Sequence, residues 1–353
     1  MKIRPPFLRR ALAALLLISL APVVRAQTFV AVGYGTGIGV SADGASWAKA
    51  TVPGFGGNVF EESLTDAAWG NGRFVAVGGD FAKGRISISA DGRVWENLPP
   101  QPERVWCVAF GNGRFVALRG RHFISSTDGK TWQDGAELPA EKQPQPLRIA
   151  FGNGVFTVIG THAWSGADYL TNGFRAVTRD GAMLEHFATG QPHARDVIFA
   201  AGQFVAVGRR ELCEVSADGR AWERRSFNRH GNDFRQVIWT GERFIAEGGS
   251  TPFASVDGKA WTPLSYEMEP IRCCPRWLWS DGKTTIASAW ESLFTSSDTR
   301  TWRDVGGLGA AVPKDPSTAK GTTFMRVVRA IGTSHSSVRP SENLTPVRYQ
   351  ARP

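Results

Sequence analysis

Residues 67–98 read AAWGNGRFVAVGGDFAKGRISISADGRVWENL, and this stretch decides the fold. The Asn71-Gly72 pair separates two apolar runs and indicates a tight hairpin, because both turn residues must accept a positive φ. The second run, residues 73–78, is followed by residues 85–89, which alternate with a period of two. Residues 90–92, Ala-Asp-Gly, then turn the chain into a last short segment that contains a Trp. The stretch is therefore predicted to form four antiparallel strands.

The same unit recurs along the chain. The Phe of its second strand recurs at Phe29, Phe74, Phe115, Phe156, Phe204 and Phe244, with Thr285 in the last copy. The closing Trp recurs at Trp47, Trp95, Trp132, Trp222, Trp261 and Trp302, with Leu184 in the fourth copy. Seven copies of a four-strand unit at a spacing of about 41 residues are typical of propeller blades. We predict an all-β protein in which residues 27–306 form a seven-bladed β-propeller of four-stranded blades.

Each closing Trp follows a turn of the form Ser-x-Asp-Gly, which becomes Thr-x-Asp-Gly in the fourth copy and Ser-x-Asp-Thr in the seventh. An Asp in this place accepts hydrogen bonds from backbone N–H groups two residues on, and the Gly supplies the unusual φ. A catalytic group is needed once per site rather than seven times, so we interpret these acids as structural. They are Asp43, Asp91, Asp128, Asp180, Asp218, Asp257 and Asp298.

These turns, placed after strands of the type Phe-Val-Ala-Val-Gly, resemble the Asp-box (BNR) repeats of the sialidase-like propeller superfamily. They also resemble the related repeats of photosystem assembly-factor-type propellers. The resemblance covers about residues 28–305 and implies the propeller fold. The sialidase Asp box has one more residue between its Asp and Gly, and the early Phe/Tyr-Arg-Ile-Pro signature of the enzymes is missing from this chain. A shared fold does not carry the activity over.

Residues 1–26 differ from the repeats. Four basic residues precede an apolar run from Ala11 to Leu20, and Val24-Arg25-Ala26 places small or apolar residues where a signal peptidase reads them. The run is shorter than the roughly 20 residues that a membrane anchor needs. We therefore expect a secretory signal that is cleaved before Gln27, and a periplasmic or secreted protein with no membrane span in its mature chain.

The formal net charge of +9 is concentrated at the two ends of the chain. Five basic residues lie within residues 1–26, and residues 307–353 carry seven basic residues against two acidic ones. The repeats themselves are close to neutral, so we expect no nucleic-acid partner. We expect a monomer.

The four cysteines do not have the spacing of zinc ligands, so we expect no metal and no other cofactor. After export they meet an oxidising compartment. Cys273-Cys274 leaves two interpretations open, a strained vicinal disulfide or buried free thiols.

The first blade lacks an innermost strand, because residues 28–33 already match the second strand of the unit. In the basic, Gly/Pro/Ser-rich tail of residues 307–353, residues 322–331 are the remaining strand-like run. We hypothesise that they supply the missing strand and close the propeller. The alternative is a disordered tail.

The connections between strands divide a propeller into two faces. The first-to-second and third-to-fourth turns share one face and are short and stereotyped, whereas the second-to-third loops and the links between blades share the other face and vary. Function on a repeated scaffold usually lies on variable loops. Blade 4 has the longest of them, residues 161–173, which gather His162, Trp164, Asp168 and Tyr169. Aromatic and polar groups together suit a sugar or a peptide; the alternative is an insertion that packs on itself.

Four arginines on the variable face form a second candidate site. Arg119 and Arg121 follow the second strand of blade 3, and Arg209 and Arg210 follow that of blade 5. The links between blades add Arg104 and Arg195 on the same face. If they converge on the mouth of the channel, their guanidinium groups suit a carboxylate or a phosphate. The alternative is a solvated rim in which acids such as Glu211 are their partners.

We favour an exported, non-enzymatic binding scaffold whose partner is a protein, a peptide or a carbohydrate, and we assign no catalytic residue. The resemblance also implies an alternative, a sialidase-like glycoside hydrolase that acts on acidic sugars. In that case Asp80 or Asp168 is the acid/base and Tyr169 or Tyr266 the nucleophile. A third hypothesis, a chaperone that assembles a membrane complex, is implied by the related repeats.

Overall fold

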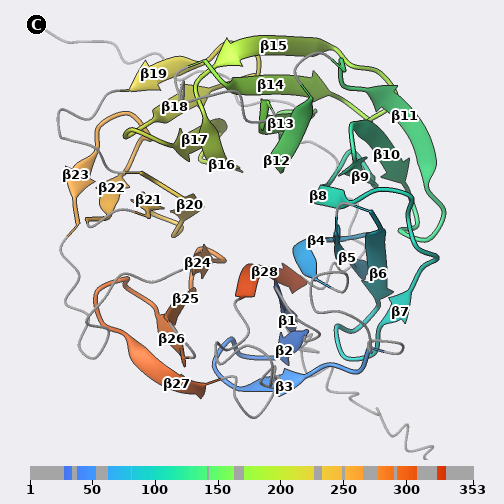
Figure 1. The fold of residues 1–353 in the computed structure, drawn as a ribbon. Helices are drawn as coiled ribbons and strands as arrows, with labels where there is room; N and C mark the ends of the chain where they lie inside the picture. The colour runs from blue at the N-terminus through green and yellow to red at the C-terminus, as the bar shows by residue number, and fades with distance from the viewer. Residues whose placement is uncertain are drawn as a thin grey trace, which may run out of the picture.

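The computed structural model describes residues 28–33, 38–52, 63–80, 82–140, 143–162, 171–225, 233–248, 251–264, 277–289, 292–307 and 324–330. These residues form seven four-stranded antiparallel sheets that stand around a central axis (Figure 1). The predicted seven-bladed β-propeller is therefore confirmed. Over the same residues there is no helix that could cross a membrane. The predicted signal segment lies outside the described residues.

Each blade has four strands, which follow one another from the axis outward. Blade 1 contains β28 (Phe324–Ala330), β1 (Thr28–Gly33), β2 (Gly39–Ser41) and β3 (Trp47–Lys49). Blades 2 and 3 contain β4 (Leu64–Gly70), β5 (Arg73–Gly79), β6 (Gly84–Ser89) and β7 (Glu96–Asn97), then β8 (Val105–Gly111), β9 (Arg114–Arg119), β10 (His122–Ser126) and β11 (Gln133–Glu137). Blades 4 and 5 contain β12 (Pro144–Gly152), β13 (Val155–His162), β14 (Gly173–Thr178) and β15 (His186–Gln191), then β16 (Ala194–Ala200), β17 (Gln203–Gly208), β18 (Cys213–Ser216) and β19 (Glu223–Arg225). Blades 6 and 7 contain β20 (Gln236–Trp239), β21 (Phe244–Glu247), β22 (Phe253–Ser255) and β23 (Thr262–Pro263), then β24 (Trp277–Ser280), β25 (Thr285–Ala289), β26 (Ser292–Ser296) and β27 (Arg303–Gly307).

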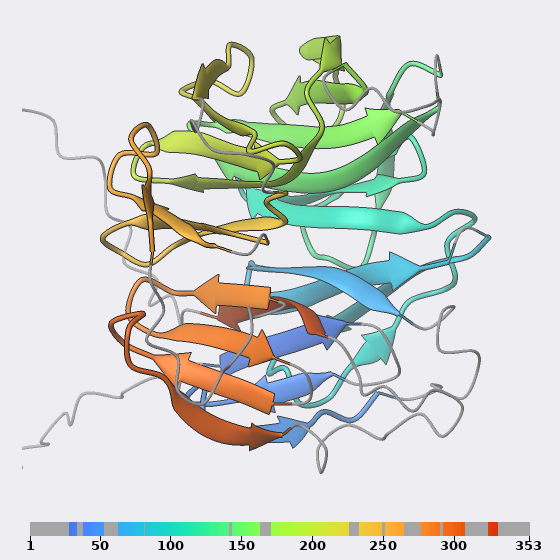
Figure 2. The same ribbon diagram turned by 60° about the vertical axis from the view of Figure 1, so that its left-hand side comes forward.

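The two ends of the described chain meet in blade 1. β28 pairs antiparallel with β1, so that Thr28 lies opposite Ala330 and Gly33 lies opposite Phe324. Figure 2 shows β28, in red, beside the blue strands of blade 1. The hypothesised C-terminal strand is thus the innermost strand of the first blade. Its pairing closes the ring and covers an edge of β1 that would otherwise stay open.

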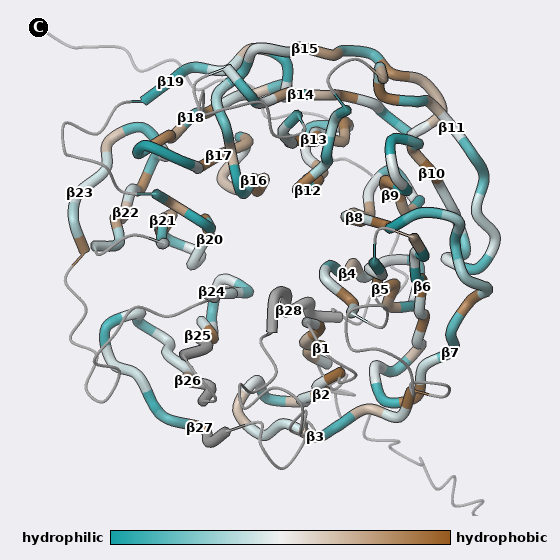
Figure 3. Tube along the Cα trace, viewed as in Figure 1, coloured by the Kyte–Doolittle hydropathy of each residue, from teal (hydrophilic) through white to brown (hydrophobic). Residues whose placement is uncertain are grey.

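The core lies between neighbouring blades. In β5, Val75 and Val77 pack toward blade 3, whereas Phe74 and Ala76 pack toward blade 1. Both faces of the inner strands are therefore covered, which explains why these strands are apolar on both sides rather than alternating. In Figure 3 the inner strands β8, β12 and β16 carry brown segments, and the outer strands β11, β19 and β27 are largely teal.

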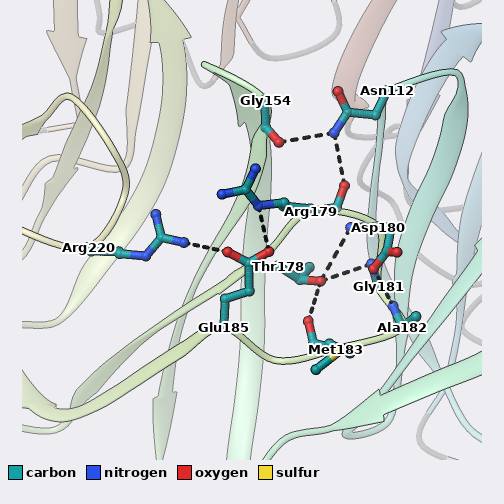
Figure 4. Close-up of polar contacts among 10 residues, drawn as sticks. All are labelled: Asn112, Gly154, Thr178, Arg179, Asp180, Gly181, Ala182, Met183, Glu185 and Arg220. Carbon is teal, nitrogen blue, oxygen red and sulfur yellow. Dashed lines mark hydrogen bonds and ion pairs between the residues drawn. The ribbon is translucent and has the colours of Figure 1, made fainter.

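The hairpin turn between the first and second strands also joins blades. Asn71 and Gly72 have φ values of 45° and 77°, as the Asn-Gly pair predicts. The side-chain amide of Asn71 donates to the carbonyls of Gly113 (2.9 Å) and Thr127 (2.8 Å), both in blade 3. Asn112 makes the same pair of bonds to blade 4, and Asn153 makes it to blade 5. We call these bonds the Asn staple; Figure 4 shows that of Asn112.

The Asp turn before each closing Trp is held by its own side chains. In blade 1, Asp43 Oδ1 accepts from the N–H groups of Ala45 (2.8 Å) and Ser46 (2.6 Å). The backbone hydrogen bond from Ser46 is the main reason why the pKa of Asp43 falls to about 2. Trp47 Nε1 donates to the carbonyl of Gly44 at 3.0 Å, which fixes the indole over the turn.

The fourth turn keeps this plan with different residues. Thr178 Oγ1 accepts from the N–H of Gly181 (2.9 Å) and donates to the carbonyl of Met183 (2.6 Å). Figure 4 also shows Glu185 between two arginines, Arg179 of the same blade and Arg220 of blade 5. An ion-pair bridge thus joins blades 4 and 5 at a copy that has lost its Trp.

Candidate functional site

The candidate loop of blade 4 is described only at its ends. His162 ends β13, is 4% exposed, and packs against Phe174 with 5.7 Å between ring centroids. Its N–H donates to the carbonyl of Asn172 at 3.0 Å across the base of the loop. His162 is therefore part of the blade rather than of an open surface. Trp164, Asp168 and Tyr169 lie outside the described residues, as does Tyr266.

The blade 3 arginines point outward, toward the fourth strand of their own blade. Arg119 Nη2 forms an ion pair with Asp134 Oδ1 of β11 at 2.8 Å. Arg121 pairs with Glu137 at the end of the same strand and donates to the carbonyl of Leu138 at 2.7 Å. Asp80, one of the hypothetical acid/base residues, accepts from the N–H groups of its own turn. In blade 3 the structure therefore places arginines with acid partners.

The blade 5 arginines lie in a strained turn between β17 and β18. The N–H of Leu212 donates to the carbonyl of Arg209 at 3.2 Å, so residues 209–212 form a tight turn. Its two central residues, Arg210 and Glu211, have φ values of 52° and 57°. This is the left-handed region, which glycine and asparagine adopt at little cost and which costs other residues about 1 kcal/mol or more each.

Groups from three segments gather beside this turn. Asp233 accepts from the N–H of Arg210 at 3.0 Å through one oxygen and from Arg195 Nη2 at 3.1 Å through the other. The N–H of Arg209 donates to the carbonyl of His193 at 3.1 Å. We call His193, Arg195, Arg209, Arg210 and Asp233 the blade 5 cluster.

The blade 5 cluster holds a neutral histidine among arginines. Burial, together with the positive charges of Arg209 and Arg195, lowers the pKa of His193 to about 4. His193 is therefore uncharged at neutral pH and can accept or donate a hydrogen bond without adding charge. The sequence alone did not bring Arg195, Asp233 and His193 together, because nothing in the order of residues shows that they meet.

Buried polar groups occur at other blade junctions. Asp66 accepts from the N–H of Val108 at 3.1 Å, and Asp196 accepts from that of Val237 at 2.9 Å, so each links its inner strand to the next blade. Between blades 4 and 5, Arg175 Nη2 and Glu214 Oε2 form a buried ion pair at 2.8 Å. The sequence signal was an Arg within an apolar strand, Phe-Arg-Ala-Val.

Glu247 is a buried acid of a different kind. It is 2% exposed, and its Oε2 has no hydrogen-bond partner among the described residues. Burial raises its pKa to about 8, against a smaller opposing effect of Arg235. Its strand reads Phe-Ile-Ala-Glu where blade 2 reads Phe-Val-Ala-Val, a signal that was visible in the sequence.

Two of the four cysteines lie within the described residues. Cys107 and Cys213 are buried free thiols, and Cys273 and Cys274 lie outside the described residues. Within the part of the chain that the structure describes, no three His, Cys, Asp or Glu side chains lie close enough together to hold a metal ion.

No protein-family model matches the sequence, and no curated protein matches it. Solved structures match in fold. YCF48 bound to a D1 peptide is 14% identical, with a TM-score of 0.54 over 74% of this chain and 85% of that one. An inactive virginiamycin B lyase from Staphylococcus aureus, solved with quinupristin, is 10% identical, with a TM-score of 0.54 over 79% and 95%. The WD40 β-propeller domain of Doa1 is 12% identical, with a TM-score of 0.50 over 78% and 89%. At these identities the chain is similar to them in its propeller fold alone.

Proposed function

We propose that this protein is an exported, non-enzymatic scaffold that binds a peptide or protein partner on its variable face, at the blade 5 cluster. The observation that carries the proposal is the set of hydrogen bonds that gathers Arg195, Arg209 and Arg210 beside His193 and Asp233. Export rests on the signal-like composition of residues 1–26. We also propose that the repeated turns of this chain belong to the Asp-box repeats.

The chemistry of the cluster favours an acidic group on the partner. The cluster and its turn contain three arginines, Arg195, Arg209 and Arg210, against two acids, Asp233 and Glu211, and the neutral imidazole does not change this balance. Guanidinium groups hold carboxylates through paired, charge-assisted hydrogen bonds. A side-chain or C-terminal carboxylate of a peptide therefore fits, and an acidic sugar has the same group.

The strain of the turn supports the same place. Two neighbouring residues other than Gly or Asn are held at positive φ, and such strain persists where the surroundings impose it. Strained turns cluster at binding sites, where they fix the direction of a side chain. In this turn the strain fixes Arg210, which is exposed.

The fold neighbours show that such a scaffold can hold a peptide. YCF48 was solved with a D1 peptide bound. Propellers bind partners through loops that a rigid set of blades holds in place. By analogy of fold alone, we extend peptide binding to this chain.

A selection from a random peptide library, followed by anisotropy titration of the selected peptides, tests the proposal. We expect the selected peptides to be rich in Asp or Glu, or to bind through a free C-terminal carboxylate. We expect the double variant Arg209→Ala/Arg210→Ala to weaken their binding at least 10-fold. The control is Arg93→Ala/Arg300→Ala, which removes the same charge from exposed Asp-turn residues on the other face.

Equal binding by both double variants would show that the blade 5 cluster is not the site. A parallel thermal-shift panel of sialic acid, uronic acids and neutral oligosaccharides tests the carbohydrate alternative. A shift with an acidic sugar alone, lost in the Arg209→Ala/Arg210→Ala variant, would replace the peptide by a glycan at the same cluster.

A further inference from the structure

Partly exposed aromatic rings from six of the seven blades line the central channel at the end where the Asn-Gly turns lie. They are Trp69, Phe110, Phe151, Phe199, Trp239 and Trp279, and we call them the aromatic collar. The collar and the inner strands below it line a cavity of about 710 Å³. This volume lies within the range of small-molecule sites. The cavity is on the axis, away from the variable loops, so it is separate from the proposed peptide site.

The rings of the collar are held in place by the blades. Phe110 lies so closely on Gly70 of the preceding blade that a Cβ on that glycine would collide with the ring. Phe151 lies on Gly111 in the same way. Behind them, Trp69 packs on Phe74 of its own blade with 4.5 Å between ring centroids. The collar is therefore rigid before any ligand arrives, which lowers the entropic cost of binding.

Several of the polar groups that line the cavity are hydrogen-bonded within the protein. The side chain of Gln236 hydrogen-bonds the backbone of Leu278. Asp281 accepts from the N–H groups of Lys283 and Thr284, at 2.8 and 2.7 Å. The inner-strand N–H groups of Val108 and Val237 are bonded to Asp66 and Asp196. Below the collar the wall includes Ala67, Val108, Ile149, Val197, Val237 and Leu278.

From these observations we infer that the channel binds an uncharged, apolar small molecule, whose body stacks on the collar. Asp281 is the single charged side chain among the described lining residues, and it is bonded to its own turn, so a charged ligand finds no oppositely charged side chain there to repay its dehydration. An apolar ligand replaces water against aromatic and aliphatic walls and gains by burial. Binding in the channel is independent of binding at the blade 5 cluster.

A pair of fluorescent probes tests the charge preference on the purified protein. N-phenyl-1-naphthylamine is uncharged, and 1-anilinonaphthalene-8-sulfonate has the same ring body with one sulfonate. We expect saturable 1:1 binding of the uncharged probe, at least 10-fold tighter than that of the sulfonate. Both probes bind nonspecific apolar surface, so the site is located by variants.

The matched variants add the same indole inside or outside the channel. Ala109 lines the cavity, and the residues at its position in blades 5, 6 and 7 are Ile198, Ile238 and Trp279, so large side chains fit there. We expect Ala109→Trp to weaken the uncharged probe at least 10-fold. Ala48→Trp, on the exposed outer strand β3, leaves binding unchanged. If Ala109→Trp does not fold, Ala109→Ile takes its place, with at least a threefold loss expected.

Three results would overturn the inference. The first is no binding of the uncharged probe, which means that water or another part of the chain keeps the channel filled. The second is tighter binding of the sulfonate. The third is equal binding by the Ala109 and Ala48 variants, which would place the probe on the outer surface.

Discussion

The junction between blades 2 and 3 and the junction between blades 6 and 7 use the same backbone positions with different chemistry. Val77 packs into the apolar core of the first, and Glu247 occupies the corresponding place in the second. Trp132 Nε1 donates to the carbonyl of Gly129 at 3.1 Å. The corresponding Trp302 Nε1 is buried and has no acceptor among the described residues.

This difference shows that the repeat fixes the backbone and leaves room for substitutions at single junctions. A propeller is held by seven junctions, so the ring persists when one of them carries a buried acid. The blade 2–3 junction shows what the repeat requires, and the blade 6–7 junction shows how far it can depart. Variants that exchange or remove features of the two junctions measure this difference.

The largest effect is expected from moving the acid into the regular junction. Val77→Glu removes a fully buried aliphatic side chain and places a carboxylate among apolar residues. We expect a loss of about 5 kcal/mol in the free energy of unfolding at pH 9, and of about 3 kcal/mol at pH 5, where the acid is neutral. Urea denaturation at both pH values measures this. Val77→Gln is the control and should show no such pH dependence; an equal loss from Val77→Glu at both pH values would mean that water reaches the junction.

The reverse exchange should stabilise the irregular junction. The folded pKa of Glu247 is about 8, above its ordinary value of 4.5, so its contribution to stability is present at low pH and is lost as pH rises from about 4.5 to 8. Glu247→Val should therefore raise the free energy of unfolding at pH 9, by on the order of 4 kcal/mol. It should change stability much less at pH 5. Parallel curves for the two proteins across this range would show that Glu247 ionises normally.

The turns and the closing strand show how much of the fold the sequence can predict. The Asn-Gly and Asp-Gly turns act over three or four residues, so Asn71 and Asp43 predicted their hairpins correctly. The closing strand was predicted because one blade lacked a partner, and β28 supplies it. The turn residues, together with the number of repeats and of strands in each, were sufficient to predict the fold.

The candidate site depends on contacts between loops, which the repeat pattern does not predict. Arg195 and Asp233 are far apart in the sequence, and which arginine meets which acid depends on how the loops of blades 5 and 6 turn. The period of a strand tells which face a residue is on but not what it meets there. For that reason Glu247 was visible as an exception in its repeat, while its lack of a partner was not.

A smaller effect is expected from the two indole N–H groups. Trp132→Phe and Trp302→Phe remove similar apolar area, but only the first breaks a hydrogen bond between described residues. We expect a loss of about 1.5 kcal/mol for Trp132→Phe and below about 0.5 kcal/mol for Trp302→Phe, where a buried N–H without an acceptor is also removed. Thermal unfolding of the two variants gives the comparison. A larger loss for Trp302→Phe would mean that its N–H finds an acceptor in solution.

The smallest effect concerns the bonds that reach across each junction on the turn face. Asn71 donates to two carbonyls of blade 3, whereas Arg243 reaches blade 7 with a longer side chain, at 3.1 Å from Asp298 O and 2.7 Å from Thr299 Oγ1. Asn71→Gly keeps the positive φ of the turn and removes only the amide, so the Asn staple can be measured without adding strain. We expect a loss of about 1 kcal/mol for Asn71→Gly and about 0.5 kcal/mol for Arg243→Ala, because ordering the longer side chain offsets more of its bonds. Urea midpoints measured for both variants at one pH give the two losses. Equal losses would mean that the short amide of Asn71 stabilises its junction no more than the long guanidinium of Arg243 stabilises the other.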